Sequence, residues 1–500
     1  MTLVAGLDIG TQSVKLLVLD VGQRRVVATH AQPLELLAGA DGSREQRPEW
    51  WLAAVRECFA RLDPALRHGI AAIGVSGQQH GFVPLDDAGD VLAPAKLWCD
   101  TSSQQECLEI MDEAGGATRC IELAGNPILA GYTASKIPWT RRHRPAVYTK
   151  LATILLPHDY VNFWLTGERW MEAGDASGTG WLDVRTRGWS AAMLKATDLQ
   201  RDLASCLPPL VAANASFPVA PAIAMELGLR TGVRVSAGGG DNMMAAIGTG
   251  NVAPGVLTMS LGTSGTLFAC GDRPVVDDGG GWAAFCSSTG GWLPLICTMN
   301  CTVATENVAR AFGFDSRDAD AVLAGTRPGA GGLVMLPFFN GERTPDLPRA
   351  RASIHGLEHA NFTRENAFRA AMEGATFTLC NGFDALRAAG LGFSSIRLTG
   401  GGSRSAVWRQ MVADVFDLPV EVPAEQEGAA FGAALQALWA CTTSGTQAQI
   451  QAVAREHVQL DASLGAQPDA VANAAYRSTY ERFLSQLRLE IDRYSHPQST

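Results

Sequence analysis

The chain of 500 residues is too long for one hydrophobic core, so two to four domains are expected. Apolar residues make up 47% of the chain and charged residues 18%, a balance that is typical of globular proteins and excludes long disordered or fibrous segments. The formal net charge of −10 gives no electrostatic reason to bind nucleic acid or an anionic membrane.

The first residues lack the basic start and long apolar run of a secretory signal, and no stretch is uniformly apolar over the ~20 residues of a membrane span. The eleven cysteines include no CxxC pair and no neighbouring histidine cluster of the kind that binds zinc. Buried, reduced thiols are the simpler interpretation. We therefore expect a cytoplasmic protein without nucleic-acid or membrane partners.

The N-terminal region begins with two β-rich runs, residues 3–7 and 14–20, which are separated by a Gly10-Thr11 turn and predict a hairpin. Three further elements are predicted in this region: a strand at residues 26–30, a helix at 48–62, and a buried strand at 70–76 that ends in the polar loop 77–81.

The layout of the N-terminal hairpin recurs in the middle of the chain. The run Gly255–Phe268 is again strand, Gly-Thr turn and strand, and Ser260 stands where Asp8 stood. This self-similarity indicates an internal duplication.

A second match joins two strands that each lead into three glycines. Residues 233–237 precede Gly238–Gly240, and residues 396–399 precede Gly400–Gly402. One glycine-rich loop would be a weak signal, but two matches in the same order predict two related α/β lobes.

The predicted boundary near residues 247–254 gives an N-terminal lobe of residues 1–247 and a C-terminal lobe of residues 248–500. The apolar spacing of residues 471–494 predicts a packing helix at the end of the second lobe. The expected fold class is therefore α/β, with two related lobes and a cleft between them.

The glycine loops suit an anionic ligand. Three consecutive glycines let the backbone approach a ligand closely, and successive free N–H groups form an anion-binding concavity. Such loops in both lobes, with hydroxyls from the Gly-Thr turns, suit a polyphosphate in the cleft, although any single loop can equally be a tight turn without a ligand. The chain has neither a Gly-Lys dipeptide, and so no P-loop, nor a G-x-G-x-x-G motif after a strand.

A divalent cation is expected beside the phosphates, because no lysine follows Lys195. Mg²⁺ suits this role, since it keeps several waters and needs few protein carboxylates. Asp8, at the tip of the first hairpin, is the candidate metal ligand, because a bare carboxylate facing phosphates would be repelled.

Asp241 is the candidate general base. It follows three glycines at a strand end and precedes Asn242 and a long uncharged segment. A carboxylate there can accept a proton from a hydroxyl that attacks phosphorus, with help of ~10²–10⁴-fold. The structural alternative is that Asp241 caps a helix that begins at Asn242.

These motifs resemble the FGGY carbohydrate kinases, which belong to the actin, hexokinase and heat-shock-chaperone superfamily of ATPases. Within the family, the resemblance is greatest to the kinases of D-xylulose. It runs from about residue 3 to residue 440 and is carried by these segments: Asp8–Thr11, Ser76–Gly81, Leu97–Asp100, Leu156–Tyr160, Asp175–Thr179, Gly238–Asn242, Ser260–Ser264, Asn340–Pro345, Gly400–Ser403 and Trp408–Met411.

The resemblance implies ATP-dependent phosphorylation of D-xylulose to D-xylulose 5-phosphate, with ATP as the co-substrate and Mg²⁺ as the metal ion. It implies a sugar-binding first lobe, in which Gln79, His80, Asp241 and Asn242 bind the sugar, and a nucleotide-binding second lobe. The residues expected at ATP are Thr11, Gln12, Ser13, Gly262, Thr263, Gly400, Gly401, Gly402 and Gln410.

Several alternatives stay open at this stage. The acceptor can be another sugar or polyol, such as ribulose, fuculose, gluconate or ribitol. An actin-like or chaperone-like ATPase without a sugar acceptor is the alternative from another class. His80 can instead be a loop histidine that bonds only to backbone, and the sequence leaves the oligomeric state open, with a homodimer as one option.

Overall fold

The computed structural model describes residues 2–495, which form two compact units. The first unit contains the chain up to Ala253 together with Cys270–Pro294 and Glu427–Val458. The second contains Pro254–Ala269, Leu295–Gln426 and the chain from Gln459 onward. Within residues 2–495, no helix is both long and apolar enough to span a bilayer.

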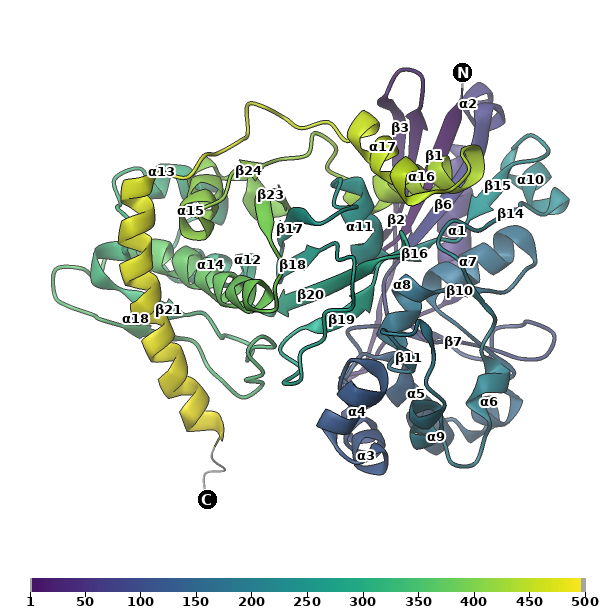
Figure 1. The fold of residues 1–500 in the computed structure, drawn as a ribbon, viewed down its shortest axis with the longest axis horizontal. Coiled ribbons are helices and arrows are strands. Elements are labelled where there is room, and N and C mark those ends of the chain that lie inside the picture. Colours follow the sequence, from purple (N-terminus) through teal and green to yellow (C-terminus); the bar gives the residue numbers. More distant parts are fainter. Residues whose placement is uncertain (1, 496–500) are drawn as a thin grey trace. The chain divides into compact units, whose positions relative to one another are not determined.

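The first unit is built on a sheet with the strand order β14-β15-β6-β1-β2-β3, in which β16 also pairs with β6 (Figure 1). Strands β1, β2 and β3 form an antiparallel meander, whereas β6 runs parallel to β1 and β15 parallel to β6. The predicted hairpin and the predicted strand at residues 26–30 are therefore confirmed. The strand bounds are β1 Leu3–Ile9, β2 Ser13–Asp20, β3 Arg25–Pro33, β6 Ile70–Gly77, β14 Ser216–Pro218, β15 Arg234–Ser236 and β16 Gly239–Gly240.

Short strands and helices complete the first unit. The strands are β4 Leu37–Ala38, β5 Arg44–Gln46, β7 Val83–Leu85, β8 Ala95–Lys96, β9 Thr153–Leu155, β10 Met171–Glu172, β11 Leu182–Asp183, β12 Gly188–Trp189, β13 Leu210–Val211 and β19 Ala283–Cys286. The helices are α1 Pro48–Ala60, α2 Pro64–Gly69, α3 Gln104–Ala114, α4 Ala117–Ala124, α5 Thr133–His143, α6 Pro145–Lys150, α7 Pro157–Thr166, α8 Ala173–Ala176, α9 Ala191–Thr197, α10 Pro221–Leu227, α11 Asp241–Gly248, α16 Gly428–Thr442 and α17 Gln447–His457, with 3₁₀ turns at Ser177–Thr179 and Leu203–Cys206.

Helices cover both faces of the first sheet, so its strands read as continuous apolar runs. In β2, Leu16 and Val18 belong to the core that contains Trp51 of α1, whereas Leu17 and Leu19 belong to the core that contains α16. Successive side chains of a strand point to opposite faces, which explains this division.

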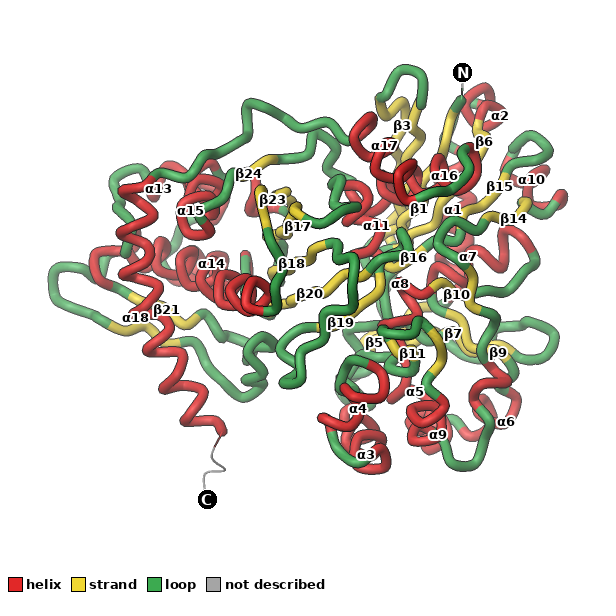
Figure 2. The backbone as a smooth tube through the Cα atoms, in the orientation of Figure 1, coloured by secondary structure: helices red, strands yellow, loops and turns green. Residues whose placement is uncertain are grey.

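The second unit has a sheet of the same type, with the order β20-β18-β17-β23-β24. Its long helices α14 and α18 lie near β21 (Figure 2), and α18 forms where the apolar spacing predicts a packing helix. The bounds are β17 Gly255–Leu261, β18 Gly265–Ala269, β20 Trp292–Thr298 (its last four residues in this unit), β21 Val334–Leu336, β22 Ser353–His355, β23 Phe393–Thr399, β24 Val420–Glu421, α12 Thr302–Ala311, α13 Ala319–Leu323, α14 Arg364–Ala388, α15 Ala406–Phe416 and α18 Ala470–Ser495, with 3₁₀ turns at Ser316–Asp318, Ala330–Gly332 and Gly401–Arg404.

The two sheets share one topology, which confirms the predicted duplication. In each, an antiparallel hairpin (β1–β2 or β17–β18) lies beside a parallel strand (β6 or β23), which is followed by a second parallel strand (β15 or β24).

The predicted equivalence of the two glycine triplets is wrong. Gly400–Gly402 follow β23, the strand next to the hairpin, whereas Gly238–Gly240 follow β15, one strand further from it. A glycine-rich loop has the same sequence pattern whichever strand it follows. The pattern therefore does not show which position that strand holds in the sheet.

Glycines let the backbone of α16 lie directly on the first sheet. A Cβ atom added to Gly6 in β1 would stand 1.8 Å from the Ala430 carbonyl oxygen, and one added to Gly74 in β6 would stand 1.9 Å from the Ala433 carbonyl oxygen. No side chain fits at either strand position.

The same helix packs equally closely on α11. A Cβ on Gly432 would lie 1.8 Å from the Met244 carbonyl oxygen, and a Cβ on Gly248 would lie 2.0 Å from the Gly428 carbonyl oxygen. Helix α16 therefore fixes α11 against β1 and β6, although it comes from a segment well beyond residue 247.

Gly432→Ala should destabilise the protein by about 1–3 kcal/mol, because the added methyl group forces two backbones apart. In a free helix the same change would stabilise by about 1 kcal/mol, so the sign of the effect tests the packing. Gly428→Ala is the matched control, since a Cβ there meets nothing within 4 Å. Urea unfolding measures both, and a Gly432→Ala variant at least as stable as the parent would contradict the packing argument.

Candidate active site

The strand register of the first sheet brings Asp8 and Asp241, two of the predicted site residues, to one edge. Asp8 lies opposite Ser76 in the β1–β6 pairing, and Ser76 lies opposite Gly239 in the β6–β16 pairing. The Ser76 hydroxyl donates a hydrogen bond of 3.0 Å to Asp8 Oδ1. Because parallel strands end at the same edge of a sheet, Asp241 follows two residues after Gly239 close to these groups.

Asp241 is the first residue of α11, and Gly240 occupies the capping position before it. The predicted capping role is therefore corrected: no side chain caps this helix, and Asp241 Oδ1 instead accepts from the backbone N–H of Asn242 at 2.8 Å. The first turn of a helix favours a carboxylate, because its N–H groups point toward the N-terminus.

Three of the predicted sugar-binding residues form one hydrogen-bonded group. The side-chain amide of Asn242 donates to Asp241 Oδ1 at 3.0 Å and to Gln79 Oε1 at 2.9 Å. Gln79 Nε2 is buried without a hydrogen-bond partner. A buried amide donor that lacks a partner is costly, so this position suits a hydroxyl-rich ligand.

The carboxylates of this edge hold protons more tightly than usual. Burial, followed by the charges of Asp8 and Asp175, raises the pKa of Asp241 to about 7. Burial likewise raises the pKa of Asp8 to about 6, against the opposing effects of Lys15 and Ser76. Asp241 nevertheless keeps part of its surface accessible, as a proton acceptor for a ligand must.

His80 lies close to this group in a conformation that is unusual for a residue with a side chain. Its φ is +64°, and its carbonyl oxygen accepts bonds from Lys136 Nζ at 2.5 Å and from the Thr133 hydroxyl at 3.1 Å. Its ring stacks on Tyr132, with 4.7 Å between centroids. Its Nδ1 lies 2.7 Å from the Gly178 carbonyl oxygen, so Nδ1 carries a proton and Nε2 is an acceptor when the ring is neutral.

The first Gly-Thr turn is held by a directed chain of hydrogen bonds. Trp98 Nε1 donates to the Thr11 hydroxyl, which donates to Gln78 Oε1, both at 3.0 Å. Gln46 accepts from Gln78 Nε2 and donates to the Thr11 carbonyl oxygen at 2.8 Å. The Thr11 hydroxyl proton is thus already engaged, so a phosphate role for this turn would fall to its backbone N–H groups.

The sequence assigned no role to Ser76, Gln46 or Lys136. Ser76 has a detectable signal, because a polar residue at the end of a buried strand needs a partner. Lys136 has none, since the sequence of α5 around it is rich in polar and basic residues. Gln46 has none, since its partners come from four separate segments.

In the second unit, the two predicted glycine turns lie side by side. A Cβ on Gly400 would stand 2.7 Å from the Leu261 carbonyl group, and a Cβ on Gly402 would stand 2.8 Å from Leu261 Cβ. The carbonyl oxygens of Gly262 and Thr263 accept from the N–H groups of Thr302 and Cys301 at the start of α12.

Gln410 lies in α15, the helix that follows the Gly400–Gly402 turn. Its amide donates to Asp414 Oδ1 at 2.8 Å and to the Gln467 carbonyl oxygen at 2.7 Å. It lines a pocket of about 650 Å³ that is formed by α15, α18 and the loop after α13.

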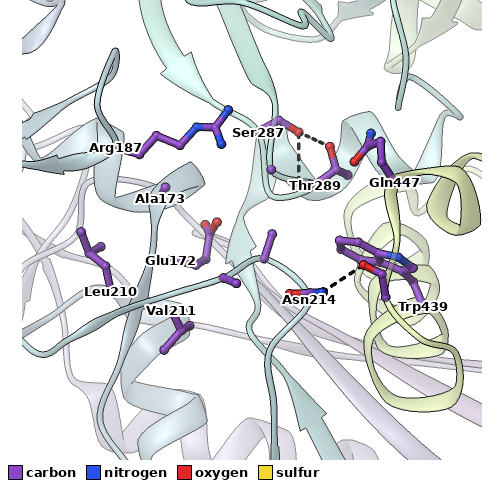
Figure 3. A pocket seen from close by; sticks show the side chains of 14 residues that line it. Glu172, Ala173, Arg187, Leu210, Val211, Asn214, Ser287, Thr289, Trp439 and Gln447 are labelled. Atoms are coloured by element: carbon purple, nitrogen blue, oxygen red, sulfur yellow. Dashed lines mark hydrogen bonds between the residues drawn. The ribbon is translucent and has the colours of Figure 1, made fainter.

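The first unit also contains a pocket of about 470 Å³ (Figure 3), whose lining includes Glu172, Arg187, Ser287, Thr289 and Trp439. None of the predicted site residues lines it. Among the described residues, no cluster of three or more histidine, cysteine, aspartate or glutamate side chains is arranged to hold a metal ion.

Comparisons with known proteins identify the family. The model of the N-terminal domain of the FGGY family of carbohydrate kinases matches residues 3–248, and that of the C-terminal domain matches residues 257–441. The chain belongs to the FGGY family of carbohydrate kinases.

Among curated FGGY relatives, the xylulose kinase of Haemophilus influenzae is 43% identical over 490 residues, which cover 96% of this chain and 99% of the relative. That of Escherichia coli is 34% identical and covers 96% of this chain and 98% of the relative. A solved xylulose kinase structure from Brucella ovis has a TM-score of 0.91, is 32% identical, and covers 97% of this chain and 99% of its own. A gluconate kinase from Lactobacillus acidophilus, 22% identical with a TM-score of 0.90 over 99% of both chains, shares the fold alone.

Asp241→Asn should stabilise the protein at pH 8 and have little effect at pH 4. The folded-state pKa of about 7 lies above the unfolded value of ~3.9, so the carboxyl group costs stability as pH rises through this interval. Asparagine keeps an acceptor for the Asn242 N–H and cannot ionise. Thermal unfolding without nucleotide or Mg²⁺ measures the difference, and equal Tm values at pH 8 would show that the carboxylate is not strained.

Proposed function

We propose that this FGGY kinase transfers the γ-phosphoryl group of ATP to the terminal hydroxyl of D-xylulose, giving D-xylulose 5-phosphate and ADP. One observation carries the proposal: the Asp241 carboxylate is fixed at the start of α11, in one hydrogen-bonded group with the amides of Asn242 and Gln79. Curated relatives named xylulose kinase, which are up to 43% identical, support the choice of sugar.

The first unit supplies the acceptor side of the reaction. Gln79, Asn242 and His80 offer amide and imidazole groups to the sugar hydroxyls, because a polyol needs several oriented partners. Asp241 accepts the proton of the attacking hydroxyl. As the O–P bond to the sugar oxygen forms, the bond from the γ-phosphorus to the bridging oxygen of ADP breaks, and the proton stays on Asp241 until solvent removes it.

The donor side uses backbone groups. The adjacent turns of the second unit at Gly262–Thr263 and Gly400–Gly402 suit phosphate and adenosine, since glycines allow close approach; in the first unit, the Thr11–Ser13 turn would contribute its N–H groups. Gln410 stays a proposed residue near the adenosine.

Asp8 fits a Mg²⁺ site. Its carboxylate lies in a buried setting that raises its pKa, and a nearby divalent cation would restore the ionised form. Mg²⁺ needs only one or two protein carboxylates when phosphates and waters supply the other ligands. When bound, the ion would neutralise phosphate charge during transfer.

The proposed cytoplasmic location is supported by the cysteines. All eleven are free thiols, and most are buried, as is usual in a reducing compartment.

A substrate panel tests the choice of sugar. D-Xylulose should give a kcat/KM at least about tenfold above those of ribulose, fuculose, gluconate and ribitol, because a site built for one pattern of hydroxyls leaves polar groups unpaired with another. Product identification by NMR confirms the phosphorylated position. Faster turnover of gluconate or ribitol would overturn the assignment, and ATP hydrolysis unaffected by every sugar would favour an ATPase without an acceptor.

Asp241→Asn should lower kcat by about 10²–10⁴-fold and leave ATP binding nearly unchanged, because Asp241 is proposed to act only on the acceptor hydroxyl. Asn242→Asp is a matched comparison that keeps the size of the neighbouring side chain. Steady-state kinetics and nucleotide titration separate the two effects. Near-parental turnover in Asp241→Asn would disprove the role of base.

A further inference from the structure

A buried charged group lies beneath the loops that carry the proposed sugar-side residues. It consists of His158 and Asp159 in the first turn of α7 and Asp175 in α8, and all three side chains are fully or almost fully buried. His158 Nδ1 lies 2.7 Å from Asp175 Oδ2, and Nε2 lies 2.9 Å from Asp159 Oδ1. We call it the histidine–aspartate group.

His158 Nδ1 forms a hydrogen bond with Asp175 Oδ2, whereas Nε2 lies within ion-pair distance of Asp159 Oδ1 without the geometry of a hydrogen bond. A buried imidazole between two carboxylates is favoured in its positively charged form, because both contacts are then with an opposite charge. Burial by itself lowers the pKa of His158, but the charge of Asp159 and the bond to Asp175 outweigh burial and raise the pKa well above its usual value. The group therefore carries one positive and two negative charges.

The loops that carry the proposed site residues lie against this group through glycines. A Cβ on Gly77, before Gln79, would stand 2.8 Å from the His158 backbone nitrogen, and a Cβ on Gly238 would stand 2.7 Å from His158 Cδ2. A Cβ on Gly240, before Asp241, would stand 3.1 Å from Asp175 Oδ1. The loop that carries Gln79 and the loop that carries Asp241 thus both pack against the histidine–aspartate group.

Asp175 also acts on Asp241 electrically. After burial and Asp8, its charge is the next cause of the raised pKa of Asp241. Glu172 of β10 is a further titratable group beside His158 and Asp175. Burial raises the pKa of Glu172 to about 7, and its carboxylate accepts from the Asp175 N–H at 2.6 Å. Among these groups on α7, α8, β10 and α11, His158 is the cation that offsets the carboxylates.

We propose that His158 is a positioning residue for the phosphoryl-transfer site, and that it acts through its positive charge: it holds Asp175 against the backbone at Gly240 and limits the negative charge felt at Asp241. This inference rests on the proposed function. A purely steric role is the alternative, in which the shape of the imidazole, and not its charge, would matter.

Two substitutions at His158 separate charge from shape. His158→Lys keeps a cation with a different shape, whereas His158→Gln keeps a polar side chain without the charge. We expect His158→Gln to lower kcat by about 10–100-fold, the cost of misplacing a reacting group by about 1 Å. His158→Lys should keep at least about ten times the kcat of His158→Gln.

Variants that remove a charge supply a second readout, the pH profile of kcat/KM, which would not change if the role of His158 were purely steric. Asp175→Asn removes a negative charge near Asp241, so the acidic limb of the pH profile of kcat/KM should move to lower pH. His158→Gln removes the positive charge, so the same limb should move to higher pH. Asp159→Asn is the matched control, because Asp159 Oδ1 lies beside the other ring nitrogen of His158 while its Oδ2 accepts from the Leu156 N–H. It should shift the limb less than Asp175→Asn.

The experiment uses the full chain with saturating ATP and Mg²⁺, D-xylulose as the acceptor, and thermal unfolding of each variant. Opposite limb shifts in Asp175→Asn and His158→Gln support the proposal, even if His158→Lys fails to fold. Equal losses in both His158 variants, or an unmoved limb in a folded Asp175→Asn protein, overturn it. If the parent phosphorylates no ketopentose, the proposed function fails instead, and the two failures are therefore distinguishable.

Discussion

Direct contact between backbones is the constraint on which the candidate site depends. Glycines at Gly6 and Gly74 let α16 lie on β1 and β6, and Gly248 and Gly432 let α11 lie on α16. Packing at this distance leaves no room for a side chain, since any added carbon atom collides with a carbonyl oxygen. The edge with Asp8 and Ser76 and the first residue of α11, Asp241, are consequently held in one rigid frame.

This frame concentrates carboxyl groups where water is scarce. Burial raises the pKa values of Asp8 and Asp175 to about 6 and that of Asp241 to about 7. Such crowding costs folding free energy, but a carboxylate with a pKa near neutrality is a better proton acceptor than an ordinary aspartate. The glycine packing offsets part of that cost by burying the apolar faces of α16, and His158 supplies a compensating charge.

The sequence predicted the local elements and the duplication well, because hairpins, buried strands and the tail helix leave periodic patterns within short windows. It also singled out Asp8, Gln79, His80, Asp241 and Asn242, of which the strand register brings Asp8 and Asp241 to one edge of the first sheet. Long-range features were missed for a physical reason: the return of α16 to the first unit, the non-equivalence of the two glycine triplets, and the pairing of His158 with Asp175 depend on contacts between distant segments. No pattern within a short window records them.

The most direct test of the account is the titration of Asp241 itself. Carbon-13 NMR of protein labelled at the aspartate carboxyl carbons, without nucleotide or Mg²⁺, identifies its resonance as the one that Asp241→Asn removes. This resonance is expected to titrate near pH 7. A midpoint close to the ~3.9 of an ordinary aspartate would show that the glycine-packed frame does not bury Asp241 among other carboxylates, and the central claim would fail.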